Sequence, residues 1–404
     1  MLSVAEAQAR IRAAFQRLGS EQVGLTAALG RVLAEDVVAR VTQPPVAVSA
    51  MDGYAVRAAD VASVPARLRV VGSAPAGGAY AGNVGAGQAV RIFTGGPLPA
   101  GADTIVIQEN TTADGDAVVV KEGAARGTYV RPAGLDFRAG EALLAKGRLL
   151  TSRDIGIAAA MNVPWLRVTR RPRIAVLATG DEVVMPGDAI GPNQIVSSNG
   201  LSLSAFATAC GAEAIHLGIV SDDLDALRRS AAGAAGADLL VTSGGASVGD
   251  HDLVQAALSS AGMTLDFWKI AMRPGKPLMF GRIGLTAVLG VPGNPVSTLV
   301  CALMFLKPAI DVMLGRTEAE QPPPTALLGR DLPQNDSRED YLRSRLSYDA
   351  HGRLVATPFD KQDSSMLSLM AKSDCLVVRA PRAPAIKAGA AVAIVPLSGG
   401  CLSI

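Results

Sequence analysis

Residues 174–315 alternate short apolar runs with longer segments of helical periodicity, and this alternation limits the possible folds more than any other feature of the chain. The strand-like runs cover 174–178, 213–220, 239–242, 265–270 and 286–290, and the helix-like segments cover 199–209, 223–235, 253–261 and 295–314. Strands and helices at this spacing form βαβ units. The sequence therefore predicts a largely parallel, Rossmann-like sheet between layers of helices, with ligands bound beyond the carboxyl ends of its strands.

The segment that follows each predicted strand is rich in polar residues and glycine. The residues concerned are Thr179, Gly180, Asp181 and Glu182 after the first strand; Ser221, Asp222 and Asp223 after the second; Ser243, Gly244, Gly245, Ser247, Gly249, Asp250 and Asp252 after the third; Arg273, Lys276 and Pro277 after the fourth; and Pro292, Gly293 and Asn294 after the fifth. Five such loops on one edge of a sheet describe a polar cleft.

This edge of the sheet combines carboxylates, cationic side chains and glycine backbone that a ligand can approach closely. Glu182, Asp222 and Asp252 offer the oxygen ligands that Mg²⁺ prefers, and like-charged carboxylates gather cheaply only around a cation. Arg273 and Lys276 offer positive charge for an oxyanion. The residues thus predict a Mg²⁺-dependent site for a phosphate-bearing, nucleotide-like molecule. Pro277 directly after the lysine excludes a Walker A loop, and a Ser-His-Asp set and a nucleophile elbow are both missing.

Taken singly, several of these features have simpler explanations. The loop after the third strand is equally well explained by an aspartate that caps the next helix. Asp52-Gly53 is typical of a β-turn, and Arg131 and Asp136 could form a surface ion pair worth less than about 1 kcal/mol. Residues 361–370 fit a short capped helix.

Together with the alternating region, the rest of the sequence predicts four domains for the whole chain. Ser3 and Glu6 form a capping-box pattern before a helical face that extends to Leu18, and Thr151 caps a second helix over 151–160. Residues 68–149 are rich in glycine and short Val/Ile runs, which indicates β structure. The predicted domains are 1–45 with 140–172, helical and extended; 46–139, β-rich; 173–320, Rossmann-like; and 321–404, a C-terminal β-barrel-like domain after the prolines of 322–324. We interpret 165–173 as a basic connector.

Composition excludes several classes of protein. The formal net charge is +2, so no overall field favours nucleic acid or a membrane surface. The four cysteines form no Cys-x-x-Cys pair, which favours reduced thiols and a cytoplasmic protein, and the three histidines have no zinc-ligand spacing. The N-terminus, with Glu6, is not a signal peptide, and we expect no membrane-spanning helix.

Six motifs in order resemble the signature segments of the MoeA family of molybdopterin molybdenumtransferases, which includes the E domain of gephyrin. They are Val-Ser-Ala-Met-Asp-Gly-Tyr-Ala-Val at 48–56, Tyr-Val-Arg-Pro-Ala-Gly at 129–134, Ala-Thr-Gly-Asp-Glu at 178–182, Ser-Gly-Gly-Ala-Ser-Val-Gly at 243–249, Pro-Gly-Lys-Pro at 274–277 and Leu-Gly-Val-Pro-Gly-Asn-Pro at 289–295. The resemblance is collinear and covers essentially the whole chain.

The resemblance implies an elongated, four-domain homodimer that inserts molybdenum from molybdate into adenylylated molybdopterin, with release of AMP and dependence on Mg²⁺. It further implies a cleft completed by the partner subunit's β-rich domain, and a MogA-like adenylyltransferase as a possible partner. The role of the domain 1–45 with 140–172 as a dimerisation domain is likewise implied by the family resemblance. The implied catalytic residues are Asp52, Asp136, Glu182, Asp252 and Lys276, and the metal ligands are Asp222 and Asp252. The implied substrate-binding residues are Thr179, Gly180, Ser243, Gly244, Gly245, Ser247, Arg273, Pro277, Pro292, Gly293, Asn294, Ser297, Arg343 and Ser365.

Two positions depart from the family pattern. The family often has lysine where this chain has Arg273, and an acid where it has Leu135; arginine and lysine are not equivalent donors. Two other functions stay open at this point. One is a molybdopterin-binding scaffold, as in receptor clustering by gephyrin, and the other is the adenylyltransferase that acts one step earlier.

Overall fold

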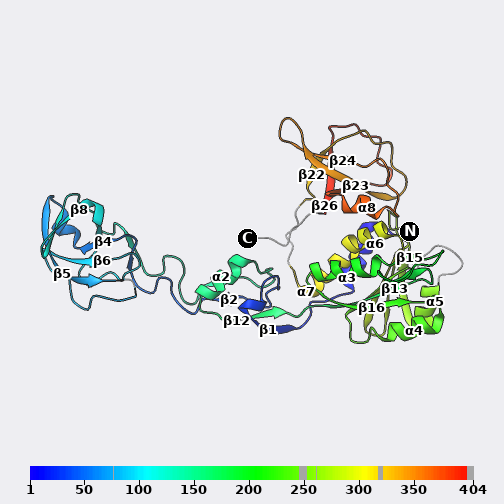
Figure 1. Cartoon of the computed structure of the whole chain (residues 1–404), viewed down its shortest axis with the longest axis horizontal. Coiled ribbons are helices and arrows are strands. Elements are labelled where there is room, and N and C mark those ends of the chain that lie inside the picture. The colour runs from blue at the N-terminus through cyan, green and yellow to red at the C-terminus, as the bar shows by residue number, and fades with distance from the viewer. Residues whose placement is uncertain (76, 245–252, 261, 317–321, 398–404) are drawn as a thin grey trace.

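The chain is elongated, with a β-rich domain at one end and an α/β domain and a β-barrel packed together at the other (Figure 1). The computed structural model describes residues 1–75, 77–244, 253–260, 262–316 and 322–397. A connecting domain lies between the two ends (Figure 1).

The α/β domain is built on a six-stranded sheet with the order β16-β13-β17-β21-β20-β18. Its strands are β13 (Arg173–Thr179), β16 (Glu213–Val220), β17 (Leu239–Ser243), β18 (Met263–Trp268), β20 (Met279–Ile283) and β21 (Thr286–Val291). β20 runs antiparallel to both of its neighbours, and the other five strands share one direction. The prediction of a largely parallel sheet is confirmed, although β20 was not predicted.

Helices cover both faces of this sheet, as the three-layer prediction requires. One face carries α1 (Val4–Ala13), α3 (Asn199–Ala209), α6 (Pro295–Cys301), the π-helical turn η4 (Ala302–Leu306) and α7 (Lys307–Leu314); the other carries α4 (Leu224–Ala232) and α5 (Leu253–Ser260). The first layer packs through a core that includes Ile11, Leu203 and Phe305, and the second through Leu227 and Leu258. All five of these side chains lie almost entirely out of solvent.

One helical run has the length and composition of a membrane span, although it contains Lys307 and Asp311. Pro295–Leu314 has 20 residues and a mean hydropathy of 1.7. In this structure 67% of its apolar window is buried inside the protein, and it forms the centre of the first helical layer. A core helix meets the same length and hydropathy criterion.

The connecting domain consists of two small antiparallel ladders and one helix. β1 (Ser20–Gly24) pairs with β12 (Trp165–Thr169), and β2 (Val37–Val38) pairs with β11 (Ala142–Leu144). The turn η1 (Leu25–Ala27) and helix α2 (Ser152–Ala160) complete it, with the predicted cap at Thr151. Two expectations were wrong here. The basic connector is the strand β12, and α1 stops at Ala13, five residues before the end of its apolar face at Leu18.

The β-rich domain is an insertion into the connecting domain. Its sheet has the order β7-β4-β6-β5-β9-β8, with β4 (Gly53–Val56), β5 (Ala66–Ala74), β6 (Gln88–Ile92), β7 (Thr104–Ile107), β8 (Thr111–Asp114) and β9 (Ala117–Val120). Short elements flank it: β3 (Val48–Ser49), β10 (Val130–Arg131), η2 (Ala58–Val61) and η3 (Gln108–Asn110). The chain enters and leaves side by side, because Gln43 N donates to Phe137 O at 2.9 Å and Asp136 N donates to Gln43 O at 3.0 Å.

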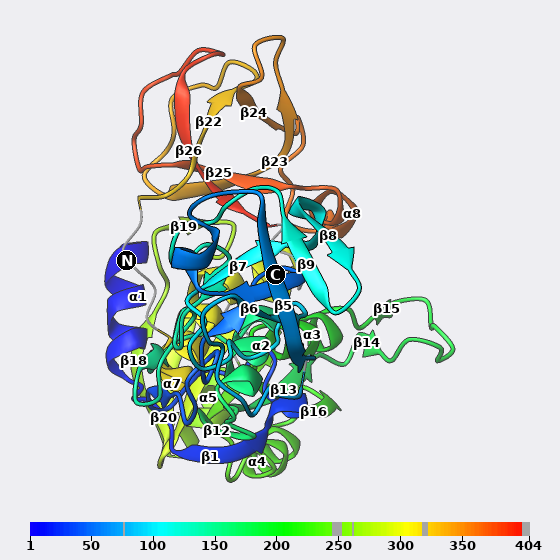
Figure 2. The same ribbon diagram turned by 90° about the vertical axis from the view of Figure 1, so that its left-hand side faces the viewer.

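The C-terminal domain closes into a five-strand barrel through the pairing of β23 with β25. Its elements are β22 (Thr325–Leu328), β23 (Glu339–Tyr348), β24 (Leu354–Pro358), α8 (Leu367–Ala371), β25 (Cys375–Arg379) and β26 (Ala391–Pro396). The barrel sits against the α/β domain at the top of Figure 2. The short strand β19 (Met272–Arg273) belongs to the α/β domain. It pairs in parallel with β23 of the barrel and so joins the two domains.

Candidate functional site

A cavity of ≈ 440 Å³ opens at the carboxyl ends of β13, β17 and β21, where the strand-helix pattern predicts a ligand site. The predicted residues that line it are Thr179, Glu182, Ser243, Gly244, Gly293, Asn294 and Ser365. Its remaining wall comes from β14 (Val183–Val184), β15 (Ile195–Val196) and the start of α3. The structure therefore brings together three loops of the sheet and two residues of the C-terminal domain, Ser365 and Leu367.

The floor of the cavity is backbone, because two glycines meet there. Gly244 has φ +101°, and a Cβ at this residue would lie 2.5 Å from Thr179 O. A Cβ on Gly293 would meet only the Cα of Gly244, at 3.6 Å. A ligand can thus approach the main chain closely at this point. Thr179 Oγ1 is buried beside it and has no hydrogen-bond partner within the described part of the chain.

Asn199, which we did not predict, ties two of the loops together. Its Nδ2 donates to Ser243 Oγ at 2.9 Å and to Gly293 O at 2.6 Å. The only local signal for this role was a polar pair, Ser198 and Asn199, at the start of a helix. The contact itself spans residues 94 positions apart.

Carboxylates gather on one side of the cavity. The Asp222 backbone N–H donates to Asp181 Oδ1 at 3.1 Å. Burial raises the pKa of Asp222, and the charges of Asp181 and Glu182 raise this pKa further. Such a group is stabilised by a nearby cation. Within the described ranges, no three His, Cys, Asp or Glu side chains are spaced to hold a metal ion. The predicted residues Gly245, Ser247, Gly249, Asp250 and Asp252 lie outside the described residues.

The C-terminal barrel contributes a buried cation, Arg343 on β23. Its side chain is 1% exposed. Nε donates to Gln362 Oε1 at 3.4 Å and Nη1 to Met366 O at 3.2 Å, but Nη2 has no partner among the residues that the structure describes. Burial lowers the pKa of Arg343. A buried guanidinium with a free N–H group is a receptor for an anion.

The segment beside Arg343 is fastened to the start of α6. Val296 N donates to Ser364 O at 3.1 Å, and Asn294 Nδ2 donates to Ser364 Oγ at 3.0 Å. Ser365 Oγ donates to Asp363 at 2.6 Å, and Ser297 is buried in α6. The barrel and the α/β domain therefore share one wall of the cavity region.

Lys276 and Pro277 lie on a loop that packs against the same helix. Gly275 has φ +118°, and a Cβ there would lie 2.7 Å from Cys301 Sγ of α6. The half-buried Lys276 side chain makes no hydrogen bond or ion pair with the residues that the structure describes. Arg273 differs: its guanidinium donates to Asp336 at 3.0 Å and also contacts Asp340. It does not line the cavity.

The two remaining predicted residues, Asp52 and Asp136, belong to the β-rich domain. Thr94 donates to Asp52 through its backbone N–H at 2.7 Å and its hydroxyl at 2.8 Å, and these bonds lower the pKa of Asp52. Thr94 was missed, because nothing in the sequence links it to a residue 42 positions earlier.

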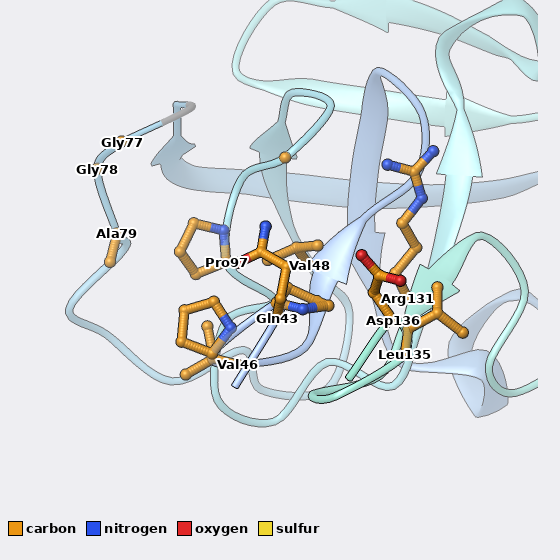
Figure 3. A pocket seen from close by; sticks show the side chains of 13 residues that line it. Gln43, Val46, Val48, Gly77, Gly78, Ala79, Pro97, Arg131, Leu135 and Asp136 are labelled. Atoms are coloured by element: carbon orange, nitrogen blue, oxygen red, sulfur yellow. The ribbon is translucent and has the colours of Figure 1, made fainter. Parts of the chain in front are cut away.

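Asp136 lines a second pocket, of ≈ 740 Å³, with Gln43, Val48, Arg131 and Leu135 (Figure 3). In one chain the β-rich domain and the α/β domain lie at different ends of the molecule (Figure 1). Asp52 and Asp136 therefore do not join the other predicted residues within a single subunit.

The fold and the cavity define a multi-domain protein whose α/β domain is of a molybdopterin-binding type. Residues 175–312 match the family model "Probable molybdopterin binding domain". Residues 2–162 match "MoeA N-terminal region (domain I and II)" and residues 325–397 match "MoeA C-terminal region (domain IV)". The chain belongs to the MoeA family.

Individual relatives agree with this assignment. The molybdopterin molybdenumtransferase of Nostoc sp. is 40% identical over 332 residues, which cover 80% of this chain and 76% of that protein. The molybdopterin molybdenumtransferase of Haemophilus influenzae is 32% identical over 382 residues, which cover 94% of this chain and 94% of that protein. The crystal structure of a molybdopterin biosynthesis MoeA protein from Pyrococcus horikosii superposes with a TM-score of 0.86 at 29% identity, over 99% of this chain and all of that one.

Proposed function

We propose that this protein is a molybdopterin molybdenumtransferase, which inserts molybdenum from molybdate into adenylylated molybdopterin and releases AMP. One observation carries the proposal: among the described residues, the Lys276 side chain and the Nη2 of Arg343 have no hydrogen-bond partner, and both belong to segments next to α6. The Lys276 loop packs on Cys301, and Arg343 on β23 contacts the 362–366 segment, which is bound to the start of α6. The start of this helix borders the glycine-floored cavity. The cations suit a small oxyanion, and the glycine floor suits a phosphate-bearing ligand.

We assign the oxyanion to the Lys276 and Arg343 side, with Ser297, Ser365 and Pro277 as its surroundings. The adenylylated substrate occupies the cavity over Gly244 and Gly293. These residues orient the two reactants, and the apolar strands β14 and β15 shield one side from water. The same assignment places Thr179, Gly180, Ser243 and Asn294 around the substrate, and Pro292 beneath it.

A magnesium ion fits the acidic side of the cavity. Asp222 lies among like charges, so a divalent cation would relieve their repulsion. We assign Asp222 and Asp252 as its ligands and Glu182 as a neighbouring carboxylate. When bound, Mg²⁺ would neutralise the phosphoanhydride of the adenylylated substrate.

We further propose a homodimer in which the partner subunit's Asp52 and Asp136 complete each site. Within one chain the β-rich domain lies far from the cavity (Figure 1). The connecting domain exposes large apolar side chains, among them Leu29 at 61% and Trp165 at 57%, which suit a subunit interface. We expect the enzyme in the cytoplasm, supplied by a MogA-like adenylyltransferase, and its described cysteines are free thiols.

The direct test is reconstitution with adenylylated molybdopterin, molybdate and MgCl₂, with molybdenum cofactor and AMP as readouts. Lys276→Ala and Asp252→Asn should each abolish conversion in a folded protein. Lys387→Ala is the matched control, because this exposed lysine pairs with Asp331 on the barrel surface. Full activity in either site variant would refute the assignment. ATP consumption without the adenylylated substrate would instead support an adenylyltransferase.

A further inference from the structure

Arg273 is held by the C-terminal domain on several sides. Nη1 donates to Asp336 Oδ2 at 3.0 Å, Nη2 donates to Asn335 Oδ1 at 3.3 Å, and Nη2 also contacts Asp340. The backbone next to it is paired as well, since Arg273 is the register partner of Asp340 and Glu339 N donates to Ala271 O at 2.9 Å. The guanidinium is therefore committed to carboxylate and amide oxygens.

The receiving groups are themselves fixed. The Asp340 side chain is 4% exposed, so the Arg273 contact compensates a buried charge. Asn335 Nδ2 donates to the backbone carbonyls of Arg338, Arg379 and Ala380 at 2.9, 3.1 and 2.9 Å. The Arg273 network is thus a rigid joint between the α/β domain and the barrel.

The position of this joint along the two strands relates it to the oxyanion site. β19 and β23 run parallel. Lys276 follows Arg273 by three residues, and Arg343 follows Asp340 by three residues. Ile270 N donates to Lys276 O at 3.0 Å, so the chain turns back after β19, and this bond anchors the Lys276 loop to the segment that leads into the joint. The tight Pro274-Gly275 segment, packed on Cys301, leaves the Lys276 loop little freedom of its own.

We propose that Arg273 is a positioning residue and not an oxyanion ligand. Its pairing with Asp340 and Asp336 holds the segment that carries the Lys276 loop against strand β23, which carries Arg343, and so fixes the spacing of the two cations that we assign to molybdate. This inference rests on the proposed function for the identity of the anion. The joint itself does not depend on it.

Asp340→Asn separates the two roles. If Arg273 bound molybdate, loss of its competing carboxylate would leave the KM for molybdate unchanged or lower. A positioning role predicts that KM rises by about 10-fold, because small displacements of a binding group cost about this much or more, while kcat at saturating molybdate stays within about two-fold. Arg273→Gln should give the same rise.

The double variant Arg273→Gln/Asp340→Asn should be no worse than either single variant, because one joint is broken in each case. Additive effects would overturn the proposal. Arg353→Gln is the matched control, since this arginine pairs with Asp349 at 2.8 Å in a turn of the same barrel; its KM should equal that of wild type.

Hydrogen exchange tests the joint without any molybdenum chemistry. In Arg273→Gln, the Glu339 amide that donates to Ala271 should exchange at least about 10-fold faster than in wild type or Arg353→Gln. Unchanged protection would overturn the positioning role. A wild-type protein that makes no cofactor but shows this exchange difference would refute the proposed function alone.

Discussion

Two buried arginines on neighbouring strands of the barrel differ in how completely their nitrogens are hydrogen-bonded. Arg379 on β25 donates through Nη2 to the backbone carbonyls of Pro333, Ala383 and Pro384, and none of its nitrogens is buried without a partner among the described residues. Arg343 on β23 keeps one nitrogen unpaired although it is more deeply buried. An unsatisfied buried donor costs stability. We therefore infer that Arg343 is kept for its function and not for the stability of the fold.

Arg343→Met should therefore lose function and keep stability. Loss of a charged partner from a buried anion site should raise the KM for molybdate by about 100-fold. The free energy of unfolding should change by less than about 1 kcal/mol, because the apolar replacement removes an incompletely paired charge. The measurements are molybdate titration of the rate and urea unfolding.

Arg379→Met is the control and should show the opposite pattern. It leaves carbonyl groups without their donor, so unfolding should become easier by about 3 kcal/mol, while the KM for molybdate stays near wild type at temperatures where the protein is folded. A stability loss at Arg343 equal to that at Arg379 would contradict the assignment of Arg343.

The two glycines of the cavity floor give a second pair of contrasting variants. Gly244→Ala meets both a positive φ and a contact of 2.5 Å with Thr179 O, and should destabilise the fold by about 2 kcal/mol or more. Gly293→Ala has room for its Cβ and should change stability by less than about 0.5 kcal/mol.

Gly293→Ala should nevertheless weaken binding of adenylylated molybdopterin by about 10-fold, since one added methyl group overpacks a close contact. Calorimetry of ligand binding, beside thermal unfolding, measures both effects. Wild-type affinity in Gly293→Ala would place the ligand elsewhere.

Among the elements, the predictions that held were those with a strong local pattern. The limits of β16 and α3 and the cap at Thr151 followed from apolar periodicity and capping residues. The prediction failed where tertiary contacts override local sequence. β12 carries Arg167, yet it pairs with β1 and buries Leu166 and Val168 in the core of the connecting domain. β20 is a short apolar run that a helix-strand alternation does not require.

The residue types of the site could be predicted from the sequence, but the hydrogen bonds that join its loops could not. Strand ends supplied Thr179, Ser243 and Gly293, because the geometry of parallel sheets brings such ends together. The bonds of Asn199 and Thr94 join residues far apart in the chain. The commitment of Arg273 to the barrel likewise depends on the pairing of β19 with β23, which no local pattern indicates.

Another interdomain bond predicts a dependence of stability on pH. Arg170 donates to Asp238 through two nitrogens, at 2.8 and 2.7 Å, and Arg173 N donates at 2.8 Å. Burial raises the pKa of Asp238, but these bonds outweigh burial and the net pKa is lowered. The carboxylate therefore stabilises the fold above its unfolded pKa of about 4, and this contribution is lost as pH falls through the folded value.

Asp238→Asn should lower the free energy of unfolding by about 2 kcal/mol at pH 7, as expected for a hydrogen-bonded charge pair. The difference between variant and wild type should shrink as pH falls below about 4. Urea unfolding from pH 3 to pH 7 measures it, and a constant difference would contradict the sign given above.

At the scale of the whole molecule, the distance between the two pockets predicts complementation between subunits. Asp52→Asn and Lys276→Ala should each be inactive alone. In a mixed dimer, one composite site would carry both substitutions and the other would carry neither. Random reassortment should restore about a quarter of wild-type activity. Mixing after mild dissociation measures it, and no recovery from proven heterodimers would contradict the composite site.

The side-by-side entry and exit of the chain at Gln43 and Phe137 makes the β-rich domain a cassette. Its ends are already joined by hydrogen bonds, so the connecting domain would stay closed if the cassette were exchanged for a short loop. Under the proposed dimer, change in the cassette that covers a neighbouring subunit's cavity is thereby separated from change in the sheet that we assign to substrate binding. In a chain with this layout, the β-rich cassette can change in sequence without any change in the core of the α/β domain.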